Sequence, residues 1–141
     1  GDVYKRQGLG DPNYAYSLLK QYKGEWEFDT NWKMIFGHPK KAGWIKAIQE
    51  AQQTVQKGLK LDCPILVMSS NKSFPETETW HEEYMTSDIV LDVQDIQKYG
   101  EKLGDKVTRD TIPNGIHDLI LSQKPYRNDA YQTIFEWLKK Q

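Results

Sequence analysis

The chain has 141 residues and a formal net charge of −1 at pH 7, so its charge favours binding neither to nucleic acid nor to an anionic membrane. This length suits a single domain, and a hydrophobic content of 38% is enough for a core. We expect no signal peptide, and no transmembrane segment because no apolar run approaches the roughly 20 residues that cross a bilayer. The single Cys63 excludes an internal disulfide and is expected to be a buried thiol of a cytoplasmic protein.

Two N-terminal segments differ in composition from the rest of the chain. Residues 1–7, GDVYKRQ, contain no Met and resemble the translation of a sequencing adapter, so we leave them out of the fold prediction and expect the natural chain to be cut upstream of Gly8. Residues 8–40 are rich in aromatic side chains, with a short helix expected near residues 14–22. This segment is expected to form a cap over an apolar pocket or, alternatively, to supply core side chains to an irregular stretch.

Residues 41–57 carry the clearest helical pattern. Apolar residues recur at spacings of four, three and four, which places them on one face that we expect to be buried: Trp44, Ile48, Ala51 and Val55. Gly58 follows at the position of a C-cap, so the helix is expected to end there.

The next part of the chain alternates strands and helices. The stretch CPILVMSS is expected to be a strand buried on both faces, and a long polar loop follows over residues 71–87. A helix over residues 92–103 is expected to start at Asp92 as its N-cap, and KVTRDTI is the second strand. A last helix is expected to begin at Asn128 or Asp129, with an inward face of Tyr131, Ile134, Phe135 and Leu138.

From residue 41 onward the order is therefore helix, strand, helix, strand, helix. This alternation predicts an α/β fold in which parallel strands are joined by right-handed crossovers. Two strands do not make a stable parallel sheet alone, because both its faces and its edges need cover. We therefore expect residues 41–141 to be the C-terminal portion of a larger α/β domain whose N-terminal strands are absent, and we expect the piece to self-associate.

Asp88 and His117 follow the two predicted strands on consecutive loops. Parallel strands end at the same edge of a sheet and lie about 4.8 Å apart, so the two side chains are expected to come within hydrogen-bond distance. An acid followed by a histidine on successive strand-end loops is typical of the second half of a hydrolytic triad. Asp92 and Asp95 are alternative acids, although the predicted N-cap already gives Asp92 a structural role.

Four stretches resemble the C-terminal half of an α/β-hydrolase: CPILVMSS, SDIVLDVQDI, GIHDLILS and YQTIFEWLKKQ. They are most similar to the branch that includes bacterial lysophospholipases and monoacylglycerol-lipase-like proteins, also described as serine aminopeptidase-type domains. The resemblance extends over about residues 22–141, since GEWEFDTNWK and GWIKAIQEAQ look like the cap-to-helix segment of these proteins.

The resemblance implies catalytic roles for two residues. His117 would act as general base towards a serine hydroxyl and then as general acid towards the leaving alcohol. Asp88 would accept a hydrogen bond from His117 Nδ1–H and fix the imidazole tautomer. Asp118 is expected to point elsewhere and shape the loop. His38 and His81 are expected at the surface or the pocket rim, because neither belongs to a metal-binding spacing such as H-E-x-x-H.

The serine nucleophile of such a triad is missing from the sequence. None of the serines stands in a G-x-S-x-G context: Ser17, Ser69, Ser70, Ser73, Ser87 and Ser122. The resemblance places this elbow upstream of the cap, so the chain alone is expected not to hydrolyse a substrate.

The implied function of the full-length protein is hydrolysis of a carboxylic ester, such as a lysophospholipid or an acylglycerol, without a metal or cofactor. The aromatic segment and the loop from Trp80 to Tyr84 are expected to line the acyl pocket. The alternative is a non-catalytic hydrolase-like module that binds a ligand or partner through the same aromatic surface.

Overall fold

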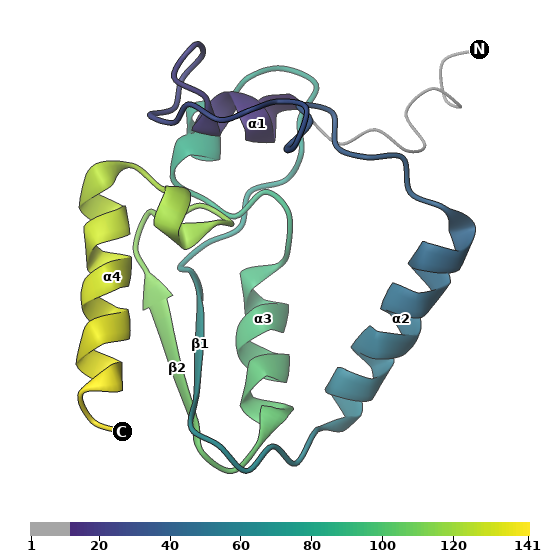
Figure 1. Cartoon of the computed structure of the whole chain (residues 1–141), viewed down its shortest axis with the longest axis vertical. Helices are drawn as coiled ribbons and strands as arrows, with labels where there is room; N and C mark the ends of the chain where they lie inside the picture. The colour runs from purple at the N-terminus through teal and green to yellow at the C-terminus, as the bar shows by residue number, and fades with distance from the viewer. Residues whose placement is uncertain (1–11) are drawn as a thin grey trace.

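Two parallel strands lie at the centre of the computed structural model, which describes residues 12–141 (Figure 1). β1 (Ile65–Ser70) pairs with β2 (Val107–Ile112) so that Ile65 lies opposite Val107 and Ser70 lies opposite Ile112. Because the pairing is parallel, both strands finish at the same edge of the sheet. The mixed α/β class agrees with the sequence prediction, whereas the adapter-like residues 1–7 lie outside the described residues.

The helix α3 (Val93–Gly100), continued by a 3₁₀ turn over Glu101–Leu103, connects the two strands. It begins as predicted at Asp92, whose Oδ1 accepts the N–H of Gln94 at 2.9 Å. The helix lies very close to β1, because a Cβ atom at Gly100 would be only 2.7 Å from Cγ1 of Val67. A glycine at this position thus allows the crossover helix to lie against the strand.

The last helix, α4 (Lys124–Leu138), starts earlier than the sequence predicted. Gln123 is its N-cap residue, so Asn128 and Asp129 lie inside the helix and do not cap it. A proline in the first turn is the physical reason, since its fixed φ suits a helix start and its missing N–H is not needed there. The predicted inward face is also largely wrong: Ile134 is half-buried, but three of its members are exposed, namely Tyr131, Phe135 and Leu138.

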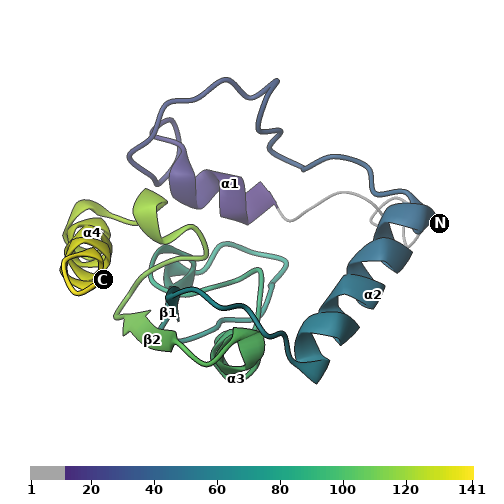
Figure 2. The same cartoon turned by 60° about the horizontal axis from the view of Figure 1, so that its bottom comes forward.

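Helix α2 (Ala42–Lys57) forms as predicted, but its apolar face is not buried. Trp44 is 52% exposed, and no residue of the helix is buried. Figures 1 and 2 show α2 standing away from the sheet, with its C-terminal end nearest to the body of the molecule. At that end Gly58 adopts a φ of 102°, and Leu59 N–H donates to the carbonyl of Lys102 at 2.7 Å. The periodicity places the apolar residues of α2 on one face, but of these only Val55, near the C-terminal end of the helix, is half-buried within residues 12–141.

The best-packed part of the molecule lies at the carboxyl ends of the strands. Helix α1 (Pro12–Leu18) lies across this edge (Figure 1), close to where a helix was expected. The buried hydrophobic residues gather mainly around it and the adjoining loops: Ala15, Leu18, Leu19, Tyr84, Met85, Ile112 and Ile116. The core of the described chain therefore supports the edge where both strand-end loops begin.

Two burial predictions at the start of β1 are wrong. Cys63 is exposed rather than buried, and only Ser69 and Ser70 at the end of the strand are buried. The preceding residues, Ile65 to Met68, are half-buried because few side chains cover this end of the two-stranded sheet. Over residues 12–141 no helix has the length and apolar character needed to cross a membrane.

Candidate active site

Asp88 reaches the end of β1 because the loop after the strand closes on itself. The loop leaves after Ser70, contains a 3₁₀ turn over Glu82–Met85, and returns to form a bridge between Ser73 and Asp88. Asp88 N–H donates to the carbonyl of Lys72 at 3.0 Å, and Phe74 N–H donates to the carbonyl of Asp88 at 2.9 Å. These backbone bonds fix the acid beside the strand end, although it follows a long excursion of the chain.

His117 lies on a tightly bonded loop after β2. Asn114 adopts a φ of 59°, a left-handed conformation that asparagine tolerates, and its N–H donates to Oδ1 of Asn71 at 3.0 Å. Gly115 N–H donates to the carbonyl of Ile112, and Ile116 N–H donates to Oγ of Ser122, both at 3.0 Å. The loop therefore has one defined path, which turns His117 back over the sheet edge.

The structure brings Asp88 and His117 into direct contact, with His117 Nδ1 2.9 Å from Asp88 Oδ2. The Asp88 residue is 1% exposed, whereas the His117 side chain is 27% exposed. The other carboxylate oxygen, Oδ1, accepts the N–H groups of Val90 at 2.8 Å and Leu91 at 2.9 Å. Because an ionised carboxylate only accepts, this contact assigns the proton to Nδ1 and leaves Nε2 as the free acceptor of a neutral imidazole.

The contact shifts both pKa values towards the charged forms. Burial alone would raise the pKa of Asp88, but hydrogen bonds from His117 and from the Leu91 and Val90 amides outweigh it, so this pKa lies below its ordinary value. The hydrogen bond to Asp88 raises the pKa of His117 above its ordinary value, and burial opposes this shift without cancelling it. The contact thus stabilises the protonated form of His117 and the ionised form of Asp88 relative to the same groups in isolation.

The alternative acids lie elsewhere. Asp92 uses its side chain to cap α3, and Asp95 is an exposed residue in the first turn of that helix. Asp118 also turns away from the pair, as expected from its position next to His117. Its Oδ2 accepts the hydroxyl of Tyr14 and lies 3.1 Å from Lys33 Nζ. Asp88 is therefore the acid that the structure places on His117.

A cleft of about 580 Å³ opens beside His117. Much of its lining is apolar and comes from both the N-terminal segment and the residues after Asp88: Ala15, Trp32, Met34, Ile35, Ile89 and Val90. The polar side chains of Lys33, His38 and Glu76 also line it. His38 was expected at the surface or at the pocket rim, and the structure places it in the lining of this cleft.

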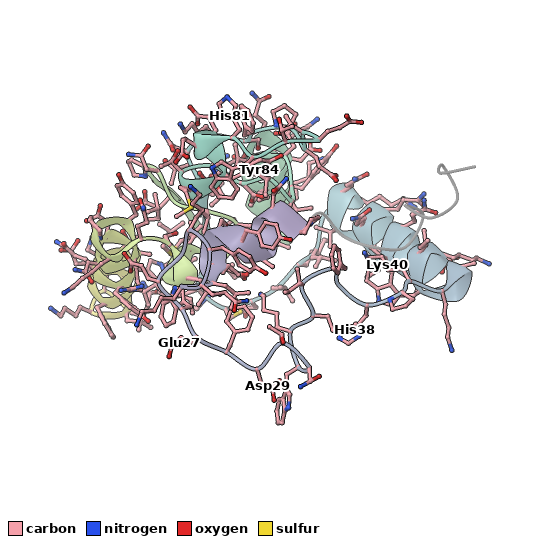
Figure 3. The ribbon with its side chains drawn as sticks, turned by 90° about the horizontal axis from the view of Figure 1, so that it is seen from above. Glu27, Asp29, His38, Lys40, His81 and Tyr84 are labelled. Carbon is pink, nitrogen blue, oxygen red and sulfur yellow. The ribbon has the colours of Figure 1, made fainter. Side chains whose placement is uncertain are left out.

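The loop from Trp80 to Tyr84 does not line this cleft. Tyr84 is fully buried and accepts the N–H of Thr77 at 2.7 Å, and Trp80 packs on Tyr84 with 5.5 Å between ring centroids. Figure 3 shows His81 and Tyr84 on the opposite side of α1 from His38. The prediction that this loop forms the pocket wall is wrong, because its aromatic residues pack on each other instead.

Sequence reasoning missed the contacts of Tyr14 and Lys33 with Asp118. Burial and then the hydrogen bond to Asp118 raise the pKa of the Tyr14 phenol well above its ordinary value. For Asp118, burial would raise the pKa, but hydrogen bonds from Tyr14 and Lys33 lower it below its usual range. No motif or periodicity relates these positions, so no signal in a single sequence could have paired them.

No described serine hydroxyl bonds to His117. Ser122 Oγ accepts the N–H of Ile116, and Ser73 Oγ donates to the carbonyl of Leu91 at 3.0 Å. The remaining serine hydroxyls are hydrogen-bonded elsewhere and are buried: Ser17, Ser69, Ser70 and Ser87. No serine of residues 12–141 is thus paired with His117 as the nucleophile of a triad would be.

Over the same residues, no group of three or more histidine, cysteine or acidic side chains could hold a metal ion. Comparisons with protein-family models, with curated proteins and with solved structures find no match for this chain. Function is therefore inferred from the geometry of the site.

Proposed function

We propose that this chain supplies the acid and the histidine of a Ser-Asp-His triad that hydrolyses carboxylic esters. The observation that carries this proposal is the 2.9 Å contact between the buried Asp88 carboxylate and Nδ1 of His117, a residue that lines a cleft with much apolar surface. The serine and the backbone donors of an oxyanion hole would come from polypeptide outside this sequence.

In this proposal each side chain has one task. His117 Nε2 accepts the serine proton as the hydroxyl oxygen attacks the ester carbonyl, and it then protonates the leaving alcohol. Asp88 holds the imidazole in the Nδ1–H tautomer and stabilises the imidazolium that forms. The upward shift in the pKa of His117 supports this assignment, because the same contact stabilises the protonated ring.

The cleft supports a substrate with an apolar acyl group. Trp32, Met34 and Val90 give it an apolar wall next to His117, which suits an acyl chain of a lysophospholipid or an acylglycerol. The chemistry proposed here needs no metal ion and no cofactor.

A second candidate function is a hydrolase-like module that binds a ligand without cleaving it. The observation in its favour is that none of the described serines reaches His117, while Trp32 at the cleft is 86% exposed and available for contact. In this function the Asp88–His117 pair would only shape the pocket.

A fluorophosphonate probe, which reacts with activated serines, distinguishes the two functions. We expect the intact full-length protein to be labelled and His117→Ala to lose labelling. His81→Ala should keep it, because His81 does not line the cleft and lies on the far side of α1 from the cleft residue His38 (Figure 3). Absence of labelling in a folded, intact protein would contradict the hydrolase and support the binding module.

A further inference from the structure

The side chain of Asp118 makes long-range contacts in place of the local one that its position offers. Asp118 is the N-cap residue of the 3₁₀ turn Leu119–Leu121, yet its side chain accepts no hydrogen bond from that turn. Its Oδ2 instead accepts the hydroxyl of Tyr14 and lies 3.1 Å from Nζ of Lys33. A single carboxylate oxygen next to His117 therefore connects the His117 loop to two points of the N-terminal segment.

Both of these partners belong to the wall of the cleft. Tyr14 and Lys33 line it, and Lys33 Nζ lies 5.5 Å from the centre of the Tyr14 ring. The Tyr14 ring also meets the His117 ring edge to face, with 6.2 Å between centroids. The contacts of Asp118 thus link the cleft wall and the histidine directly.

A separate contact holds the earlier part of the same segment. Trp26 Nε1–H donates to the carbonyl of Leu121 at 2.8 Å, and Arg127 lies over the Trp26 ring at 4.7 Å. Glu25 forms an ion pair with Arg127 at 3.4 Å. These bonds fix residues 25 and 26, which precede the cleft-lining residues Trp32 to His38.

The residues from 29 to 38 that line the cleft are otherwise bonded locally. In this described stretch the N–H groups of Trp32 and Lys33 donate to the carbonyl of Asp29, and Gly37 N–H donates to the carbonyl of Met34. The ion pair from Lys33 to Asp118 spans to the His117 loop and is half-exposed on both sides. The ion pair with Asp118 therefore joins this part of the cleft wall to the His117 loop.

We propose that Asp118 is a positioning residue. Through its ion pair with Lys33 it holds residues 29–38 against the His117 loop, and so keeps the cleft wall beside the histidine. The inference rests on the proposed function only in taking this cleft as the substrate site. Trp32 and Met34 keep their positions along the cleft while the ion pair between Lys33 and Asp118 is formed. The carboxylate also adds a negative charge near the His117 ring, and Lys33 adds a positive one.

The test uses the intact full-length protein and two variants, Asp118→Asn and Lys33→Met, with Asp105→Asn as the matched control because Asp105 is an exposed carboxylate outside the cleft. The rate of amide hydrogen exchange in residues 29–38 reports how firmly this stretch is held. An NMR pH titration reports the pKa of His117. Both variants are expected to exchange on the order of fivefold faster in this stretch, as loss of one half-exposed charged hydrogen bond predicts.

The titration checks that the charges of Asp118 and Lys33 lie near the His117 ring. Asp118→Asn is expected to lower the pKa of His117, because a nearby negative charge is lost, and Lys33→Met to raise it, because a positive charge is lost. If amide exchange in residues 29–38 is unchanged in Lys33→Met, the positioning role of Asp118 is wrong. This conclusion holds even if Asp118→Asn does not fold. Neither readout needs turnover, so failure of the hydrolase proposal remains a separate result.

Discussion

Asp88 keeps its charge in a buried position because every part of its carboxylate has a partner. His117 contacts Oδ2, and the Val90 and Leu91 amides donate to Oδ1. Removing the imidazole would leave a buried charge with fewer partners, which is costly in a protein interior. The same bonds orient the ring, so stability and orientation of the site have one physical origin.

We predict that His117 titrates above its ordinary value of about 6.5 and that Asp88→Asn lowers this midpoint, because the amide cannot stabilise the imidazolium as a carboxylate does. The measurement is an NMR pH titration of the His117 ring in the intact full-length protein. Asp95→Asn, which removes an exposed carboxylate of α3, serves as the control. A His117 midpoint that is the same with and without the Asp88 carboxylate would contradict the pairing.

The pair also predicts how stability depends on pH. Because the pKa of His117 is raised on folding, its contribution is fully present below about 6.5 and is lost as pH rises through the folded-state pKa. Because the pKa of Asp88 is lowered on folding, its contribution is present above about 3.8 and is lost as pH falls through the lowered pKa. The pair therefore stabilises the fold most in the pH range where both groups are charged.

At the scale of elements, the structure combines a well-packed edge with exposed apolar surfaces. The strand ends are covered by α1 and the loops around it, whereas α2 presents Trp44, Ile45 and Ile48 to solvent. Each strand of the two-stranded sheet also has an outer edge without a paired strand among the described residues. Unpaired strand edges and apolar faces of this kind promote association between chains.

We therefore predict that the 141-residue chain self-associates in a concentration-dependent way. Sedimentation velocity measures this directly, and Trp44→Gln combined with Ile48→Gln should reduce the association by removing apolar area from α2. Gln52→Glu, a change at an exposed polar position of the same helix, is the control. A monodisperse monomer that unfolds cooperatively would contradict this prediction.

At the scale of the whole molecule, the sequence was sufficient to predict the features that depend on local residue pattern and on strand direction. The alternation of helix and strand predicted parallel pairing, and parallel pairing placed Asp88 and His117 at one edge, where the structure has them 2.9 Å apart. The N-cap at Asp92 also followed from local chemistry.

What the sequence could not predict depends on contacts between distant segments. Periodicity gave the apolar face of α2 but could not say whether a neighbour covers it. Tyr14 and Asp118 are separated by 104 positions, and no pattern links them. The position of the aromatic loop around Tyr84 was predicted wrongly for the same reason. Composition indicates that aromatic rings pack, but it does not say which residues they pack against.

The most direct test compares two acids in the full-length protein, which we propose to be a hydrolase. We predict that Asp88→Asn lowers kcat by on the order of 10³- to 10⁴-fold, because the imidazole loses its fixed tautomer and the stabilisation of its charged form. Asp92→Asn should keep nearly full turnover, because asparagine also caps a helix. Full activity in Asp88→Asn together with a large loss in Asp92→Asn would contradict the account and assign the acid to Asp92.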